Sequence, residues 1–222
     1  TQFRVITIDL RGHGESDAPL WHYSLDQAAD DVCGLMDHLS IRQPILVGLS
    51  MGGYIALAFY RKYAERVKGL VLADTRAQAD TEDGKRARFE MAQIAYKQGP
   101  SAIADIMIPK LLSPGTIQTR PALVQRVRTM IEGNQVSGIA GDLMAMAERP
   151  DSIPHLQQIR CPTQVIVGEL DVPTPPADAR LMAERIPNAR LAVIPGAGHL
   201  SNLEQPELFN QIVRSLCGTL TK

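Results

Sequence analysis

The chain has 222 residues, of which 45% are hydrophobic, 21% charged and 5% aromatic. This length is sufficient for one large domain that needs no disulfide or structural metal. With 23 basic and 24 acidic residues and no run of five like charges, the sequence lacks the charge pattern of proteins that bind nucleic acid or an anionic membrane.

Short apolar runs alternate with segments of helical periodicity, a pattern typical of parallel strands covered by helices. An α/β fold is therefore predicted. The runs expected to form strands are Phe3–Leu10, Pro44–Leu49, Val67–Ala73, Thr163–Gly168 and Arg190–Ile194. Helices are expected from Leu25 to Leu39 behind a Ser24/Gln27 capping box, from just after Ser50 to about Tyr63, from Pro175 to near Ile186, and over Glu204–Leu216.

Between roughly Ala77 and Gln158 no strand is expected, and helical segments follow one another. A stretch of that length is too long for a loop. It is interpreted as an all-helical insertion between two strands of the sheet, with clear helices at Glu82–Gln98, Pro121–Glu132 and Gly138–Ala147. Its methionines are interpreted mainly as gap-filling core residues, with a flexible pocket wall as the alternative: Met91, Met107, Met130, Met144 and Met146.

The cysteines Cys33, Cys161 and Cys217 are odd in number and far apart, which fits a reducing compartment, and a cytoplasmic location is expected. No apolar run is long enough to cross a membrane, and no signal peptide is recognisable. The first residue is Thr1 rather than Met, and a strand is expected almost at once, so a segment upstream of Thr1 is expected.

The strongest motif is Gly48-Leu49-Ser50-Met51-Gly52, which matches G-x-S-x-G where an apolar run meets a helix pattern. A reversal from strand to helix in so few residues strains the backbone of the central serine, and glycines on either side avoid collisions. Ser50 is thus predicted to protrude at the carboxyl end of the sheet. The following helix directs its N-terminal N–H groups at the same place, where an oxyanion would form.

A serine nucleophile needs a base, and the base needs an orienting acid. His199, in Pro195–His199 directly after a strand, is the preferred base. His13 also follows a strand but is interpreted as a residue that organises its loop, while the other histidines are interpreted as solvated or capping: His22, His38 and His155. For the acid, Asp171 and Asp74 both follow strands. Asp171 is preferred because it gives the order Ser, Asp, His on successive strand ends.

With these motifs the chain resembles the α/β-hydrolase family over nearly its whole length. Asp9–Asp17 resembles the loop after the family's fourth strand and Gly48–Gly53 its nucleophile elbow, while Gly168–Asp171 and Gly196–His199 resemble its acid and histidine loops. The resemblance implies an α/β-hydrolase core at 1–76 and 159–222 and a helical cap at 77–158. Gly48–Leu72 and His199–Pro206 look most like the branch of 3-oxoadipate enol-lactonases and small carboxylesterases.

The resemblance also implies a serine esterase or lactonase with Ser50, Asp171 and His199 as catalytic residues, acting on a small molecule without cofactor or metal. A monomer or a homodimer is expected. The Met51 N–H is expected to be one oxyanion donor. The family's second donor and its first strands are not in this sequence, and the donor is expected upstream of Thr1. Haloalkane dehalogenases are disfavoured, because they attack with aspartate.

The cap is expected to set substrate preference. Its apolar residues favour an apolar substrate: Ile103, Ile106, Met107, Met144 and Met146. Some of its arginines are candidates to bind a substrate carboxylate, although solvated positions are expected: Arg86, Arg88, Arg126 and Arg128. Two alternative functions remain open: a C–C hydrolase or perhydrolase using the same triad, and a catalytically impaired binding protein.

Overall fold

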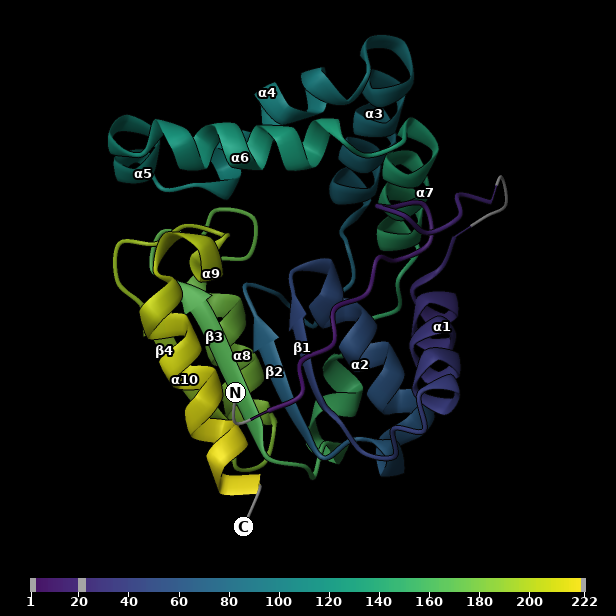
Figure 1. The fold of residues 1–222 in the computed structure, drawn as a ribbon, viewed down its shortest axis with the longest axis vertical. Helices are drawn as coiled ribbons and strands as arrows, with labels where there is room; N and C mark the ends of the chain where they lie inside the picture. The colour runs from purple at the N-terminus through teal and green to yellow at the C-terminus, as the bar shows by residue number, and fades with distance from the viewer. Residues whose placement is uncertain (1–2, 20–22, 221–222) are drawn as a thin grey trace.

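The computed structural model describes residues 3–19 and 23–220, and within them one parallel sheet has the strand order β1-β2-β3-β4 (Figure 1). The strands are β1 (Ile45–Leu49), β2 (Gly69–Ala73), β3 (Thr163–Gly168) and β4 (Arg190–Ile194). All three ladders are parallel, in registers such as Leu46 with Leu70 and Val165 with Leu191. The predicted α/β class is confirmed, and four of the five predicted strands form.

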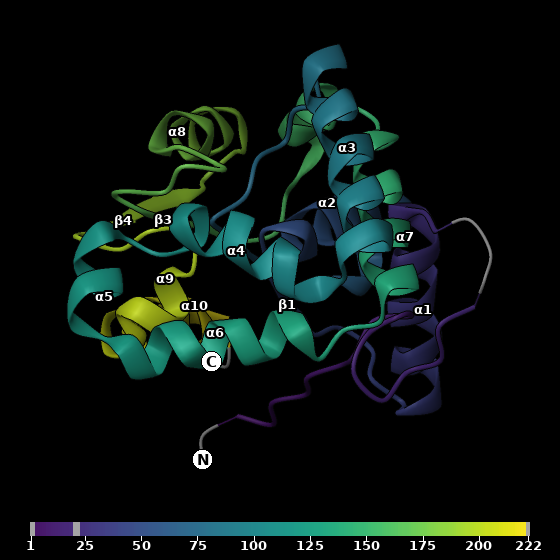
Figure 2. The ribbon, with the colours of Figure 1, turned by 90° about the horizontal axis from the view of Figure 1, so that it is seen from above.

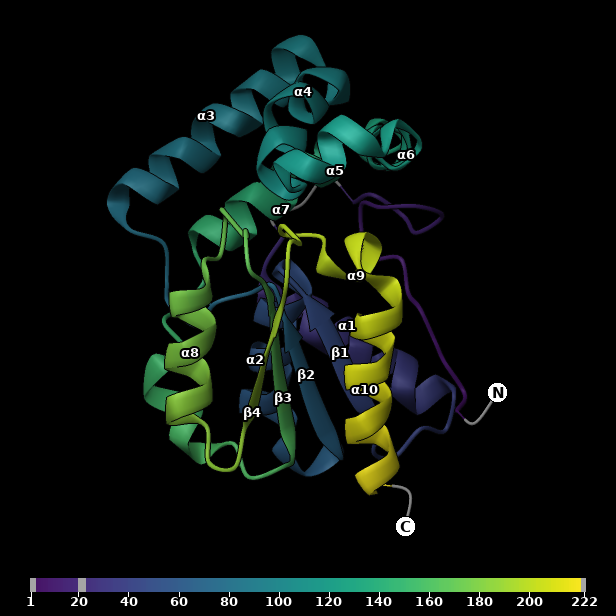
Figure 3. The ribbon, with the colours of Figure 1, turned by 90° about the vertical axis from the view of Figure 1, so that its left-hand side faces the viewer.

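Helices cover both faces of the sheet (Figure 3). On one face lie α1 (Leu25–His38), α2 (Met51–Tyr63) and α8 (Pro176–Arg185), and on the other α10 (Pro206–Leu220). Side chains of successive strand residues point to opposite faces, so the buried residues of β2 divide between two clusters. Leu70 and Leu72 pack with α1, α2 and α8, while Val71 and Ala73 pack with α10.

Local signals set the helix ends. The predicted capping box forms: Ser24 accepts from the Gln27 N–H, and the Gln27 side chain accepts from the Ser24 N–H. The sequence predicts one helix over Glu204–Leu216, but the short helix α9 (Ser201–Glu204) ends at Glu204 and α10 begins at Pro206. Proline has no N–H to continue a helix and suits the first position of a new one.

The prediction of a strand at Phe3–Leu10 is wrong. Among the described residues, positions 3–9 donate no backbone hydrogen bond to another backbone group, and Val5 is 81% exposed. Figure 2 shows this segment running outside the rest of the ribbon. An apolar run becomes a strand only when a neighbouring strand pairs with its N–H and C=O groups, and within the described residues no strand lies beside this one.

Five helices lie between β2 and β3, over the carboxyl ends of the strands (Figures 1 and 2). They are α3 (Glu82–Gln98), α4 (Pro100–Leu111), α5 (Pro114–Thr119), α6 (Pro121–Glu132) and α7 (Val136–Ala147). We call residues 77–158 the insertion. α3 packs on α7 and α4 on α6, and Ala104, Ile108, Leu112, Leu123 and Val127 form an apolar cluster of its own.

The two ends of the insertion are joined at its base. The Ser152 N–H donates to the Ala77 carbonyl at 2.9 Å. Nearby, the buried Arg149 pairs with Asp80 at 2.8 Å, and its guanidinium lies 4.2 Å from the centre of the Tyr54 ring on α2. This contact attaches the base of the insertion to the helix that begins after Ser50.

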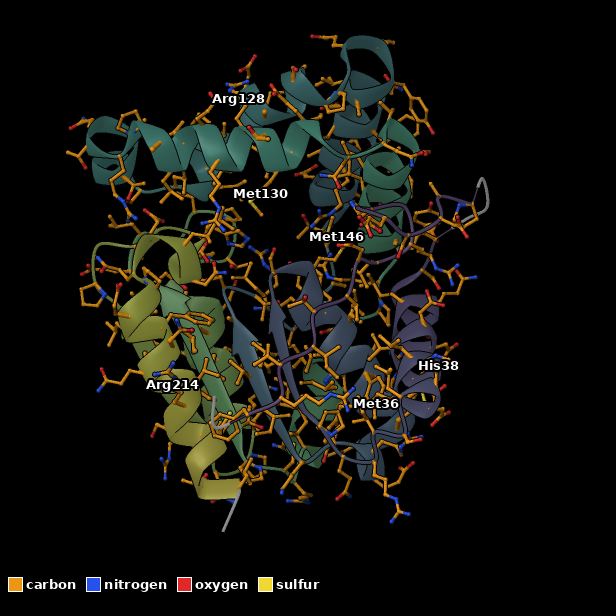
Figure 4. The ribbon with its side chains drawn as sticks, in the orientation of Figure 1. Met36, His38, Arg128, Met130, Met146 and Arg214 are labelled. Atoms are coloured by element: carbon orange, nitrogen blue, oxygen red, sulfur yellow. The ribbon has the colours of Figure 1, made fainter. Side chains whose placement is uncertain are left out.

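The insertion's methionines divide between the two interpretations. Met91, Met107, Met144 and Met146 are partly buried and Met146 packs against the main apolar core, whereas Met130 is 56% exposed. Figure 4 shows Met130 on the side of α6 that faces the sheet. The alternative, a flexible apolar wall, suits that position better.

Cys33, Cys161 and Cys217 all lie in the described part of the chain and form no disulfide. No helix among the described residues has the length and hydropathy that crossing a membrane would require. Among the described residues, 3-10 turns form at Ala64–Arg66 and Ile153–Gln158.

Candidate active site

Ser50 lies at the turn between β1 and α2, with φ 53° and ψ −115°. This left-handed backbone is costly for a residue with a side chain. Surrounding hydrogen bonds hold it: the Ser50 N–H donates to the Ala73 carbonyl at 2.9 Å, and the Thr75 hydroxyl donates to the Ser50 carbonyl at 2.7 Å. The turn is thus fixed from both sides by the end of β2, and the Ser50 side chain is left to face the loops above the sheet.

Of the two glycines predicted to prevent collisions around Ser50, Gly48 does so and Gly52 does not. A Cβ on Gly48 would lie 2.2 Å from the Gly52 carbonyl oxygen, so Gly48 is needed for the close approach of strand and helix. A Cβ on Gly52 would contact nothing outside its own helix turn. The second tight position is Gly53, where a Cβ would lie 2.4 Å from the Thr75 hydroxyl oxygen. Gly53 therefore lets the helix approach the loop after β2.

The structure brings the three predicted catalytic residues together. His199 Nε2 lies 2.8 Å from Ser50 Oγ, and His199 Nδ1 lies 2.9 Å from each carboxylate oxygen of Asp171. Asp171 and His199 are buried, while Ser50 is partly exposed. A neutral imidazole that donates from Nδ1 to the carboxylate leaves Nε2 free to accept the serine proton. The arrangement is able to activate a hydroxyl nucleophile.

Thr174 orients the Asp171 carboxylate, a contact that the sequence did not predict. The Thr174 N–H donates to Asp171 Oδ1 at 2.9 Å and its hydroxyl to Oδ2 at 2.8 Å. With the imidazole also donating to it, the buried carboxylate has several hydrogen-bond donors, as a buried charge requires. The signal in the sequence was the spacing Asp-x-x-Thr, which permits such a local turn.

Asp74, the alternative acid, does not contact His199. It is fully buried after β2, where its Oδ1 accepts the Gly168 N–H at 2.8 Å and its Oδ2 accepts the Ser201 hydroxyl. Burial raises the pKa of Asp74 to about 7, against the opposing effect of these two hydrogen bonds. Asp74 thus links the end of β3 to the segment that follows His199.

We expect Asp74→Asn to stabilise the fold more at pH 8 than at pH 5. The raised pKa means that folding favours the protonated acid, so Asp74 costs stability progressively as the pH rises from about 4 to about 7. Asparagine keeps an acceptor for Gly168 and a donor for Ser201 but never ionises. Denaturant unfolding should show a gain about 2–3 kcal/mol larger at pH 8 than at pH 5.

The wild-type protein, unfolded at the same two pH values, is the reference for that measurement. A gain from Asp74→Asn that is equal at both pH values would contradict a raised pKa.

His13 organises its loop, as predicted, and its ring hydrogen-bonds to residues outside the triad. Its Nδ1 lies 2.6 Å from Asn134 Oδ1 and its Nε2 2.5 Å from Asp142 Oδ2, so the loop is tied to the insertion. The hydrogen bond to Asp142 raises the pKa of His13.

The other histidines are predicted to be solvated or capping. His38 is exposed at the end of α1, and His155 lies in the 3-10 turn near the insertion's end. His22 lies outside the described residues.

The Met51 N–H begins α2 beside Ser50 and, in the described part of the chain, donates to no backbone carbonyl. The first N–H groups of a helix lack partners within it and carry the positive end of its dipole. The Met51 N–H is therefore available to a negative oxygen next to Ser50.

Across residues 3–19 and 23–220, no group of three or more His, Cys, Asp or Glu side chains is arranged to hold a metal ion.

Three of the four candidate arginines of the insertion already pair with carboxylates. Arg86 pairs with Asp83, Arg88 with Asp80, and Arg128 with Asp105 and Glu132. Arg126 is exposed and has no ion-pair partner within the described chain. Of these four arginines, Arg126 is therefore the one whose positive charge is not paired with a carboxylate of the described chain.

Comparisons with known proteins identify the family to which this fold is related. A family model described as alpha/beta hydrolase fold matches residues 1–206. The 3-oxoadipate enol-lactonase 2 of Acinetobacter baylyi is 35% identical over 97% of this chain and 79% of its own length. A thermophilic esterase from Thermogutta terrifontis, solved with malate bound, superposes with TM-score 0.93 at 41% identity, over 96% of this chain and 79% of that one. An enol-lactonase from Burkholderia xenovorans gives TM-score 0.88 at 31% identity, over 95% of this chain and 79% of that one.

Proposed function

Since the chain belongs to the alpha/beta hydrolase family, we propose that it is a serine hydrolase that cleaves carboxylic esters or lactones through an acyl-enzyme. One observation carries the proposal: His199 Nε2 lies 2.8 Å from Ser50 Oγ while its Nδ1 lies 2.9 Å from Asp171. The similarity to esterases and enol-lactonases supports the same class of substrate.

In the proposed mechanism His199 takes the proton of Ser50 as its oxygen attacks the carbonyl carbon of the substrate. Asp171 holds the imidazole in the required tautomer and stabilises the imidazolium. The Met51 N–H donates to the tetrahedral oxyanion, assisted by the positive end of α2. His199 then protonates the leaving alcohol, and a water activated by the same histidine hydrolyses the acyl-enzyme.

The division into a core of 1–76 and 159–222 and a cap of 77–158 stays a prediction, and the position of the five helices over the strand ends supports it (Figure 1). We propose that the insertion encloses the substrate. Met130, exposed on the face of α6 toward the sheet (Figure 4), favours an apolar acyl or alcohol group. Because Arg86, Arg88 and Arg128 are already paired, neutral esters and lactones fit better than carboxylated ones.

The direct test compares initial rates on neutral p-nitrophenyl esters, on a neutral lactone and on a carboxylated enol-lactone. We expect saturable turnover of the neutral substrates with kcat of about 1–10³ s⁻¹. A strong preference for the carboxylated enol-lactone that is lost in Arg126→Gln would instead assign Arg126 to carboxylate binding.

The alternatives have their own outcomes in the same assay. Cleavage of a 1,3-diketone faster than of esters would favour a C–C hydrolase, and peracid formation from acetate and peroxide would favour a perhydrolase. Absence of turnover, together with failure of a fluorophosphonate to label Ser50, would favour a binding protein.

A further inference from the structure

Glu204 joins the loop that carries His199 to the insertion. Its side chain is buried, and the residue is 4% exposed. One carboxylate oxygen, Oε1, accepts the Gly198 N–H at 2.6 Å. The other, Oε2, accepts the Ser113 N–H at 3.0 Å and the Ser113 hydroxyl at 2.6 Å. The Glu204 side chain thus bridges the segments around Gly198 and Ser113. Their separation in sequence is about the length of the insertion.

The bridge needs a carboxylate in particular. Both oxygens act as acceptors, and a carboxylate is the side-chain group of this size that offers acceptors on both sides. No cation lies within ion-pair distance of Glu204 among the described residues, so its three neutral donors are what offsets the cost of burying it. An amide would direct an NH₂ group at one of the two backbone N–H donors and lose that hydrogen bond.

The bridge lies directly beside His199. Gly198, which precedes it, bonds to Glu204, and Leu200, which follows it, donates its N–H to the Leu111 carbonyl of the insertion at 3.1 Å. A Cβ on Gly198 would lie 2.8 Å from the Ser113 N atom, so the two segments are in close contact. Both neighbours of His199 in the chain therefore depend on residues 111–113 for their position.

Further contacts of the same segment strengthen this attachment. Leu200 and Leu203 pack against the insertion's own apolar cluster. The Arg120 guanidinium donates to the Glu204 carbonyl at 2.7 Å, and the Ser113 hydroxyl also contacts Thr116 at 3.1 Å. The α4–α5 junction is thereby fixed on the histidine loop rather than merely lying above it.

We propose that Glu204 is a positioning residue: it holds His199 at hydrogen-bond distance from Ser50 by anchoring the His199 loop to Ser113 of the insertion. This inference rests on the proposed function, because it assigns Glu204 a role in the serine–histidine reaction. It makes the insertion part of the support for catalysis, in addition to enclosing the substrate.

The test is Glu204→Gln, with Glu207→Gln as the matched control because Glu207 is exposed three residues further along. For Glu204→Gln we expect kcat to fall about 10–100-fold, as a small misplacement of a catalytic group does, while KM changes less than about threefold. Labelling of Ser50 by a fluorophosphonate should slow by the same factor as kcat. Circular dichroism and thermal unfolding establish that the variant is folded at the assay temperature.

A purely structural role would lower Tm but leave the labelling rate of the folded protein unchanged, and that result would overturn the proposal. If Glu204→Gln does not fold, Ser113→Ala takes its place, because it removes one hydroxyl donor and keeps the N–H. We expect it to slow labelling about 3–10-fold, and wild-type labelling would overturn the proposal equally. The proposed function fails separately, if Ser50→Ala retains activity.

Discussion

Ser50→Ala is expected to lower kcat for ester hydrolysis by about 10⁴–10⁶-fold, the effect of removing a serine nucleophile. The substitution deletes the one oxygen placed 2.8 Å from His199 Nε2. It leaves the turn intact, because the hydrogen bonds that hold Ser50 use its backbone N–H and carbonyl groups. We therefore expect Tm to change little, and labelling by a fluorophosphonate to disappear from the intact-mass spectrum.

Ser215→Ala is the matched control, since Ser215 is exposed on α10, away from the carboxyl ends of the strands. It should keep wild-type rates and labelling. If Ser50→Ala retains more than about 1% of the wild-type rate of ester hydrolysis, the assignment of Ser50 as nucleophile is wrong.

The second large effect is expected from Asp171→Asn, for which kcat should fall about 10⁴-fold. Asp171 accepts from His199 Nδ1 and from the Thr174 N–H and hydroxyl. An asparagine amide directed at Nδ1 would make that nitrogen an acceptor, which moves the imidazole proton to Nε2. In that tautomer Nε2 cannot take the Ser50 proton, although the fold is intact. Steady-state kinetics beside circular dichroism measure this separation of activity from folding.

Comparing the activity of Asp74→Asn with that of Asp171→Asn distinguishes between the two candidate acids. Asp74 bonds to Gly168 and Ser201 and not to His199, so its asparagine variant should keep activity within about tenfold of wild type. The reverse outcome, with Asp74→Asn inactive and Asp171→Asn active, would move the role of the acid to Asp74.

Hydrophobic patterning predicted most of the fold. β3 and β4 have the predicted bounds, and α3 and α6 also match, because each is a continuous apolar or amphipathic run between clear breakers. α4 and α5 were not predicted, since prolines interrupt 99–120 and α4 contains Pro109. The failure at Phe3–Leu10 has another cause: strand formation depends on a pairing partner, which local sequence does not report.

The positions of the three predicted catalytic residues were predictable because they follow from the topology of the sheet. Parallel strands direct their carboxyl ends to one edge, so residues just after three strands were expected to meet, and Ser50, Asp171 and His199 do. The supporting contacts were not predictable. That Glu204 would reach Ser113, 91 positions away, depends on how the insertion folds back on the core, and no local pattern encodes it.

The paired ends of the insertion bear on how this protein could be remodelled. Because the Ser152 N–H meets the Ala77 carbonyl at 2.9 Å, residues between them form a nearly closed loop, and the entropy of closing a loop grows only slowly with its length. A segment of different length could thus be grafted there while the sheet stays as it is. We expect such a chimera to fold. It should turn over substrate slowly unless the graft also presents hydrogen-bond donors to Glu204 where Ser113 now lies.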